Sequence, residues 1–297
     1  MIIIFLNNKL ITCDTIVPLI KELVDLHSAG CAEFLCFDQS TYQAISENSV
    51  LCDAIYSIGT LKMIGRKDKS NKNKLFHRIK VFPLILKYVF SGLAGKAVFL
   101  HFKALNSGPL KILAQLFPSK TILVQGSSIG FTPLEKQVSE MAKDRNYDSF
   151  ESMGQTIIAF NKNWDYLNHH SVSKKKLYFL SPPHSRSYWD KYILKKQEEY
   201  FKAEFDDAGI KPTEEIIPYM LCWMGPNNYT RKPDSYPGLF DETLGLLGAL
   251  IGNRTLFVKQ HPSDAGDKKA RENIQLIIDR HPSLNVILTN LHPIVLS

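Results

Sequence analysis

Residues 97–124, AVFLHFKALNSGPLKILAQLFPSKTILV, contain two short apolar runs separated by a helical pattern. The runs at 97–102 and 121–124 have the length and the β-branched and aromatic content of strands. Apolar side chains recur at helical spacing over 108–116. Strands joined by a crossover helix run parallel in one sheet. This segment therefore predicts an α/β fold with a parallel sheet.

The same alternation continues along the chain in both directions and then restarts. The expected strands of the first run are 2–6, 33–37, 54–58, 97–102, 121–124, 156–160 and 177–180, and its expected helices are 15–27, 39–47, 75–90, 108–116 and 132–145. After a Lys- and Glu-rich helix at 187–206, the second run has expected strands 216–223, 255–259 and 285–289 and expected helices 241–251 and 267–280. We therefore predict two Rossmann-like lobes, 1–175 and 176–297. We expect the second to be incomplete, because it stops at Ser297 soon after a strand.

Composition and charge narrow the class of protein. The hydrophobic share of 44% and the charged share of 22% are those of an ordinary globular chain and exclude collagen, coiled-coil and disordered classes. The net charge is +7. The segment 62–80 accounts for all of this excess, because it holds eight basic residues and the single acid Asp68. The remainder is near neutral, so we expect no nucleic-acid partner.

The five cysteines form no C-x-x-C pair, which favours a reducing compartment. The N-terminus lacks the basic region of a signal peptide, and no apolar run has the length of a membrane span. We therefore predict a cytoplasmic protein. The basic segment 62–80, followed by an apolar and aromatic helix, suggests peripheral contact with an anionic membrane surface, although a solvated loop has the same pattern. We expect no metal site, because His169-His170 has no ligand at suitable spacing.

Lys259-Gln260-His261-Pro262-Ser263-Asp264 follows the expected strand 255–259, and α/β proteins bind ligands at the carboxyl ends of their strands. If Ser263 or Asp264 caps the next helix, Lys259 and His261 flank a helix N-terminus, which favours an anion such as a nucleotide phosphate. His261 would serve either protonated or as an N–H donor. A surface turn with an incidental histidine is the alternative, since His-Pro recurs twice.

Two further loops follow strands in the same way. In Gln125-Gly126-Ser127-Ser128, the glycine allows close backbone approach, and the hydroxyls can bind ligand oxygens. An ordinary glycine turn before Thr132-Pro133 explains the pattern equally well. The second loop, after the strand at 216–223, contains Gly225 and Asn227, and a plain loop explains it as well.

These motifs together resemble a known family. LFPSKTILVQGSSIGF resembles the segment of bacterial lipooligosaccharide sialyltransferases in which a strand leads into an acidic Asp/Glu-Asp/Glu-Gly motif. LFVKQHPSD resembles the K-x-HP motif of those enzymes, and VILTNLHPIVLS resembles the strand and loop that follow it. The resemblance covers residues 110–131 and 216–297. A similar K-x-HP motif occurs in glycerophosphotransferases that use CDP-glycerol.

The resemblance implies a GT-B-like fold and a metal-independent, inverting glycosyltransferase without a cofactor. It implies a donor with a CMP- or otherwise nucleotide-activated sugar, sialic acid-like, and a cell-surface glycan or glycolipid acceptor. It places the donor in the C-terminal lobe and the acceptor in the N-terminal lobe. Its catalytic positions are His261, on the donor phosphate, and Gln125. Its binding positions are Lys259, Pro262, Ser263, Gly126, Ser127, Ser128, Gly225 and Asn227.

Gln125 marks a departure from the family, because the acidic motif aligns with Val124-Gln125. An amide cannot take a proton from an acceptor hydroxyl. Another carboxylate such as Asp14 then serves as the base, or the donor differs, or turnover has been lost. The alternatives to a glycosyltransferase are therefore a CDP-alcohol phosphotransferase and a truncated, non-catalytic remnant.

Overall fold

The computed structural model consists of two compact units. It describes residues 1–6, 9–27, 29–64, 74–101, 109–124, 155–160, 168–169, 174–183, 186–208, 216–221, 236–252, 254–261, 264 and 267–289. One unit comprises Met1–Asn8, Thr12–Tyr42 and Ala54–Arg186; the other comprises Lys9–Ile11, Gln43–Asp53 and Ser187–Ser297. Each unit has a parallel sheet of its own, which confirms the predicted α/β class.

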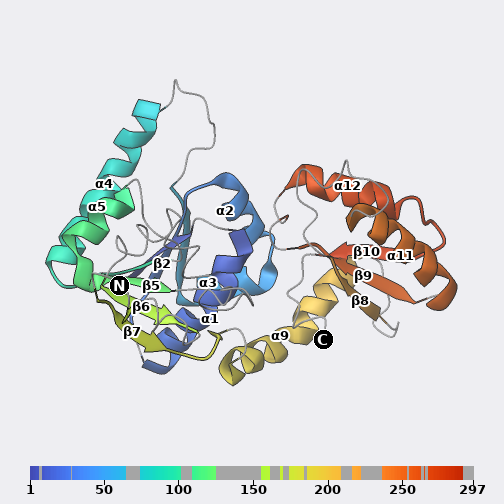
Figure 1. Ribbon diagram of the computed structural model, residues 1–297, viewed down its shortest axis with the longest axis horizontal. Coiled ribbons are helices and arrows are strands. Elements are labelled where there is room, and N and C mark those ends of the chain that lie inside the picture. Colours follow the sequence, from blue (N-terminus) through green and yellow to red (C-terminus); the bar gives the residue numbers. More distant parts are fainter. Residues whose placement is uncertain are drawn as a thin grey trace. The chain divides into compact units, whose positions relative to one another are not determined.

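The first unit is built on a seven-stranded sheet with the strand order β3-β2-β1-β4-β5-β6-β7 (Figure 1). The strands are β1 (Ile2–Leu6), β2 (Ala32–Cys36), β3 (Gly59–Met63), β4 (Val98–His101), β5 (Thr121–Val124), β6 (Thr156–Ala159) and β7 (Lys176–Phe179). All neighbouring pairs are parallel. The order reverses between β1 and β4, which is the Rossmann arrangement.

Helices cover both faces of this sheet, and its central strands are therefore buried on both sides. The helices are α1 (Lys9–His27), α2 (Gln39–Ser46), α3 (Ser49–Ile58), α4 (Lys74–Leu93) and α5 (Pro109–Leu116). Every residue of β1 and β2 is buried. On one face α4 and α5 share a core with the sheet that includes Phe5, Phe99, Leu113 and Phe117. On the opposite face, α1 and the sheet together line an apolar cavity of about 350 Å³.

The second unit has the strand order β10-β9-β8, again all parallel. Its elements are α9 (Ser187–Ala208), β8 (Ile216–Met220), α11 (Tyr236–Leu250), β9 (Thr255–Lys259), α12 (Lys268–Ile278) and β10 (Asn285–Thr289). Phe240 and Leu244 of α11, Ile274 of α12 and Leu256 and Val258 of β9 meet in one core. The central strand β9 is buried along its whole length.

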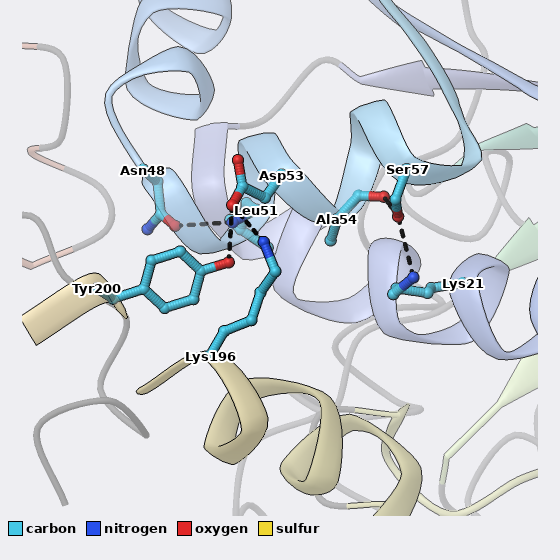
Figure 2. Close-up of polar contacts among 8 residues, drawn as sticks. All are labelled: Lys21, Asn48, Leu51, Asp53, Ala54, Ser57, Lys196 and Tyr200. Atoms are coloured by element: carbon cyan, nitrogen blue, oxygen red, sulfur yellow. Dashed lines mark hydrogen bonds and ion pairs between the residues drawn. The ribbon is translucent and has the colours of Figure 1, made fainter. Parts of the chain in front are cut away.

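A polar cluster joins α9 to the start of α3 (Figure 2). Lys196 Nζ and Tyr200 Oη both donate to Asp53 Oδ2, at 2.8 and 3.1 Å. The hydrogen bond to Asp53 raises the pKa of Lys196, so the ammonium form is favoured. Asn48 Oδ1 accepts the Leu51 N–H at 3.1 Å and caps α3. These contacts explain why residues 43–53 group with α9, although strands of the first sheet lie on both sides of them in the sequence.

The prediction of a strand at 54–58 was wrong, because these residues form the second half of α3. The buried side chains of this helix are Val50, Leu51, Ala54, Ile55 and Ile58, which recur at helical and not at alternating spacing. The strand follows at Gly59. A Cβ added at Gly59 would lie 1.8 Å from the carbonyl oxygen of Ala32, so β3 starts at a residue that lets β2 approach closely.

The expected boundary after residue 175 also requires correction. β7 pairs in parallel with β6, from Thr156 opposite Lys176 to Ala159 opposite Phe179, and therefore completes the first sheet. The first unit ends at Arg186. The helix expected at 132–145 and residues 65–73 of the basic segment lie outside the described residues.

Candidate functional site

Buried polar side chains gather at the carboxyl edge of the second sheet. Lys259 is the last residue of β9 and lies in register with Met220 of β8 and Thr289 of β10. Lys259, Gln260 and Thr289 are 5%, 3% and 1% exposed. This is the edge at which parallel sheets bind ligands. The cluster therefore marks the candidate site of this unit.

The chain beyond Lys259 is held by two successive turns. The Asp264 N–H donates to the His261 carbonyl at 2.9 Å, and the Asp267 N–H donates to the Asp264 carbonyl at 3.0 Å. The Gln260 amide also donates to the Asp264 carbonyl, at 3.2 Å. Asp264 is itself buried. These bonds connect Gln260, His261, Asp264 and Asp267 to one another.

His261 is half-buried above this edge. Burial lowers its pKa below the ordinary 6.5, and the nearby Asp264 carboxylate offsets only part of this effect. The imidazole is therefore neutral at pH 7 and offers one N–H donor. Of the two forms expected from the sequence, the structure favours the N–H donor.

The expected helix cap was wrong. Asp267, and neither Ser263 nor Asp264, caps α12, and its carboxylate accepts the Ala270 N–H at 3.2 Å. His261 lies seven residues before the start of α12 at Lys268. The field of a helix end acts mainly within its first turn. An anion beside His261 would therefore depend on side chains and loop N–H groups.

The structure tests the placement of only some of the predicted residues. Those outside the described residues are Gln125, Gly126, Ser127, Ser128, Gly225, Asn227, Pro262 and Ser263. Leu221, which precedes the loop of Gly225 and Asn227, donates its N–H to the Lys259 carbonyl at 2.9 Å. Val124, which precedes Gln125, is buried at the carboxyl end of β5.

Sequence reasoning missed Gln260, Asp264 and Thr289, although all three are buried polar residues at the same edge. The available signal was their position. Gln260 and Asp264 directly follow a strand of continuous apolar character, and Thr289 ends the next one. Polar residues at the end of such a strand are either exposed or part of a site, and the sequence does not distinguish these cases.

A second polar group lies at the carboxyl edge of the first sheet. His101 ends β4, next to Phe5 of β1, and is 1% exposed. Asp14, in the second turn of α1, is half-buried. Burial, Cys36 and the Asp14 carboxylate all raise the pKa of Cys13, so this thiol stays neutral. His101 therefore places an imidazole at the edge where β1 and β4 pair, and it was not among the predicted residues.

The described residues include no group of three or more His, Cys, Asp or Glu side chains that could hold a metal ion. In the same part of the chain, no helix is long and apolar enough to cross a membrane.

Comparison with known proteins gives distant structural similarities only. No protein-family model and no curated protein matches the chain. Among solved structures, the GT-B domain of a Photobacterium damselae sialyltransferase is 12% identical, with 99% of this chain and 82% of that one covered, at a TM-score of 0.46. UDP-N-acetylglucosamine 2-epimerase from Rickettsia bellii is 13% identical, with 97% of this chain and 69% of that one covered, at a TM-score of 0.44. E. coli heptosyltransferase WaaC with ADP is 10% identical, with 97% of this chain and 75% of that one covered, at a TM-score of 0.41. Scores of this size establish no shared activity, and the fold rests on the two parallel sheets themselves.

Proposed function

We propose that this chain is a glycosyltransferase that moves a sugar from a nucleotide-activated donor to a glycan or glycolipid acceptor. The observation that carries the proposal is the cluster of the buried Lys259, Gln260 and Asp264 with the half-buried His261, at the carboxyl edge of the central strand β9. Such a cluster, held by two turns, suits the phosphate of a nucleotide. The resemblance of LFVKQHPSD to the K-x-HP motif supports the same assignment.

His261 and Lys259 would divide the work on the leaving group. As the acceptor oxygen bonds to the anomeric carbon, the bond from that carbon to the phosphate oxygen breaks, and negative charge grows on the phosphate. The neutral His261 imidazole donates its N–H to this phosphate. Lys259 is 5% exposed, so it acts from beneath the loop through its positive charge. Donors fixed in place contribute several kcal/mol to such a step.

The acceptor hydroxyl must lose a proton in the same step, with inversion at the anomeric carbon. Gln125 cannot accept it. Asp14 is a half-buried carboxylate of α1 in the first unit, and it is the candidate base that the departure at Gln125 leaves. No metal or cofactor takes part in the proposed reaction.

The donor nucleotide is proposed to be CMP with a sialic acid-like sugar. CDP-glycerol is the second candidate donor, because the K-x-HP motif also occurs in enzymes that transfer glycerol phosphate. The two differ in the bond that breaks: the sugar–oxygen bond in the first and the bond between the two phosphates in the second. Incubation with each donor and analysis of the products by mass spectrometry distinguishes them.

His261→Ala tests the nucleotide site. Titration calorimetry with CMP and CDP should show binding to the wild type and at least a tenfold loss in the variant. This expectation rests on the loss of a hydrogen bond to a charged group, about 1.5–3 kcal/mol. His27→Ala is the matched control, because His27 is exposed at the end of α1. A wild type that binds neither nucleotide would support the non-catalytic alternative.

Asp14→Asn tests the base separately. If Asp14 takes the proton, kcat should fall by at least a hundredfold, while the Kd for the nucleotide stays unchanged. The loss should be smaller at high pH, where more acceptor is ionised. An unchanged kcat would remove Asp14 from the mechanism and leave the nucleotide site intact.

A further inference from the structure

A stripe of large apolar side chains lies exposed along α4. Phe82, Leu86, Phe90 and Leu93 are 60%, 38%, 65% and 68% exposed. Their spacing of four, four and three residues places them on one face of the helix. Single exposed apolar residues are common on proteins, but an aligned row of four is not.

Helix α5 extends this surface. Ile112 and Leu116, one turn apart, are 54% and 55% exposed. The helices lie side by side (Figure 1), and a Cβ added at Gly92 of α4 would come within 2.8 Å of the Phe117 ring that follows α5. The Lys120 ammonium also donates to the Gly92 carbonyl, at 2.5 Å. We call Phe82, Leu86, Phe90, Leu93, Ile112 and Leu116 the α4–α5 apolar surface.

The rotation of α4 is fixed by polar contacts on its inner side. Tyr88 is fully buried and donates its hydroxyl to Glu33 of β2 at 2.7 Å, and Lys87 donates to the same carboxylate at 2.6 Å. Burial alone would raise the pKa of Glu33, but the hydrogen bonds from Lys87, Tyr88 and Lys62 lower it to about 2. An ionised Glu33 therefore holds Tyr88 inward, and the apolar stripe faces outward as a consequence.

We propose that the α4–α5 apolar surface binds an anionic lipid bilayer. Neither α4 nor α5 contains an Asp or Glu. α4 also begins within the basic segment 62–80, which contains eight basic residues and a single acid. Basic residues next to exposed Phe and Leu are typical of helices that lie in the membrane interface. Protein interfaces, in contrast, are depleted in Lys at their core. This proposal does not depend on the chemistry proposed for His261.

Flotation of the full chain with vesicles tests the proposal. We expect at least tenfold stronger binding to vesicles of 70% phosphatidylcholine and 30% phosphatidylglycerol than to pure phosphatidylcholine, and weaker binding as salt rises. Phe82→Ser/Phe90→Ser should reduce binding to the anionic vesicles at least tenfold. The matched control is Leu246→Ser/Leu250→Ser, since these leucines of α11 are 69% and 75% exposed, and it should bind as the wild type does.

Three outcomes would overturn the proposal. The first is equal binding to both vesicle types, which would show that binding does not require anionic lipid. The second is an equal loss of binding in the control variant, which would show that the α4–α5 apolar surface is not the membrane-binding site. The third is no vesicle binding together with a dimer in light scattering that Phe82→Ser/Phe90→Ser dissociates, which would assign the surface to a second copy. Far-UV circular dichroism establishes that each variant is folded.

Discussion

Glu33→Gln removes the negative charge of the Glu33 carboxylate. This carboxylate accepts hydrogen bonds from Lys62 Nζ, Lys87 Nζ and Tyr88 Oη at 3.1, 2.6 and 2.7 Å. Because these partners lower the pKa of Glu33 from 4.5 to about 2, the carboxylate stabilises the fold at every pH above 4.5, and this contribution disappears as the pH falls from 4.5 towards 2. We expect the free energy of unfolding of the variant to be lower by on the order of 2 kcal/mol at pH 7. The effect is smaller than for a fully buried ion pair because both lysines are half-exposed. Urea unfolding of both proteins at several pH values measures this difference.

The matched control for Glu33 is Glu272→Gln. Glu272 is an exposed residue of α12 whose nearest ammonium, that of Lys268, lies 3.7 Å away. Its removal should change the free energy of unfolding by less than about 0.5 kcal/mol. A Glu33→Gln variant as stable as this control at pH 7 would show that the buried cluster does not hold α4.

At the level of a helix, Asn48 determines where α3 begins. Its side chain accepts the Leu51 N–H, and Asn48 is only 3% exposed. Asn48→Ala should therefore destabilise the protein by about 1 kcal/mol, the usual effect of losing an N-cap. Asn48→Asp keeps the acceptor and should recover most of the loss, as measured by thermal unfolding. A similar loss in both variants would mean that packing around Asn48, and not the cap, is responsible.

The error at 54–58 and the success at 255–259 show which elements local pattern can define. Thr255–Lys259 is buried on both faces, and such a strand is a continuous apolar run that ends at a charge. The sequence at 54–58 is also apolar and rich in Ile and Tyr, so a short window favours a strand. Only the wider window from Val50, together with the cap at Asn48, reveals the helical spacing. Local composition therefore defined β9, whereas α3 required the context of ten residues.

The candidate site was predictable only where it follows directly from position. Lys259 and His261 were predicted because they stand at the end of a recognisable strand. Gln260 and Thr289 were missed because β8 and β10 lie far from β9 in the sequence, and no local pattern shows that these strands pair. The cap at Asp267 was missed for a related reason, since Ser263, Asp264 and Asp267 are all acceptable caps and only the path of the loop selects one.

The same limit applies to the division of the whole chain. Strand pairing decides that β7 belongs to the first sheet, and no local pattern states which sheet a strand joins. Residues 43–53 belong to the second unit through contacts such as that of Asp53 with Lys196, which are 143 residues apart in sequence. A segment 187–297 expressed alone would therefore lack part of its own unit.

If nucleotides bind only at the carboxyl edge of β9, their effect on the whole molecule should be local. Hydrogen exchange with CMP or CDP at a hundred times its Kd should slow the amides of 255–261, and that of Leu221 beside Lys259, by up to about a hundredfold, since linkage at that concentration contributes about 2.7 kcal/mol. Peptides from β1, β2 and β3 should exchange at unchanged rates. Because His261→Ala removes the donor to the phosphate, it should also remove the protection at 255–261. Protection confined to the first sheet would instead place the nucleotide at the His101 edge and reverse the assignment of donor and acceptor to the two units.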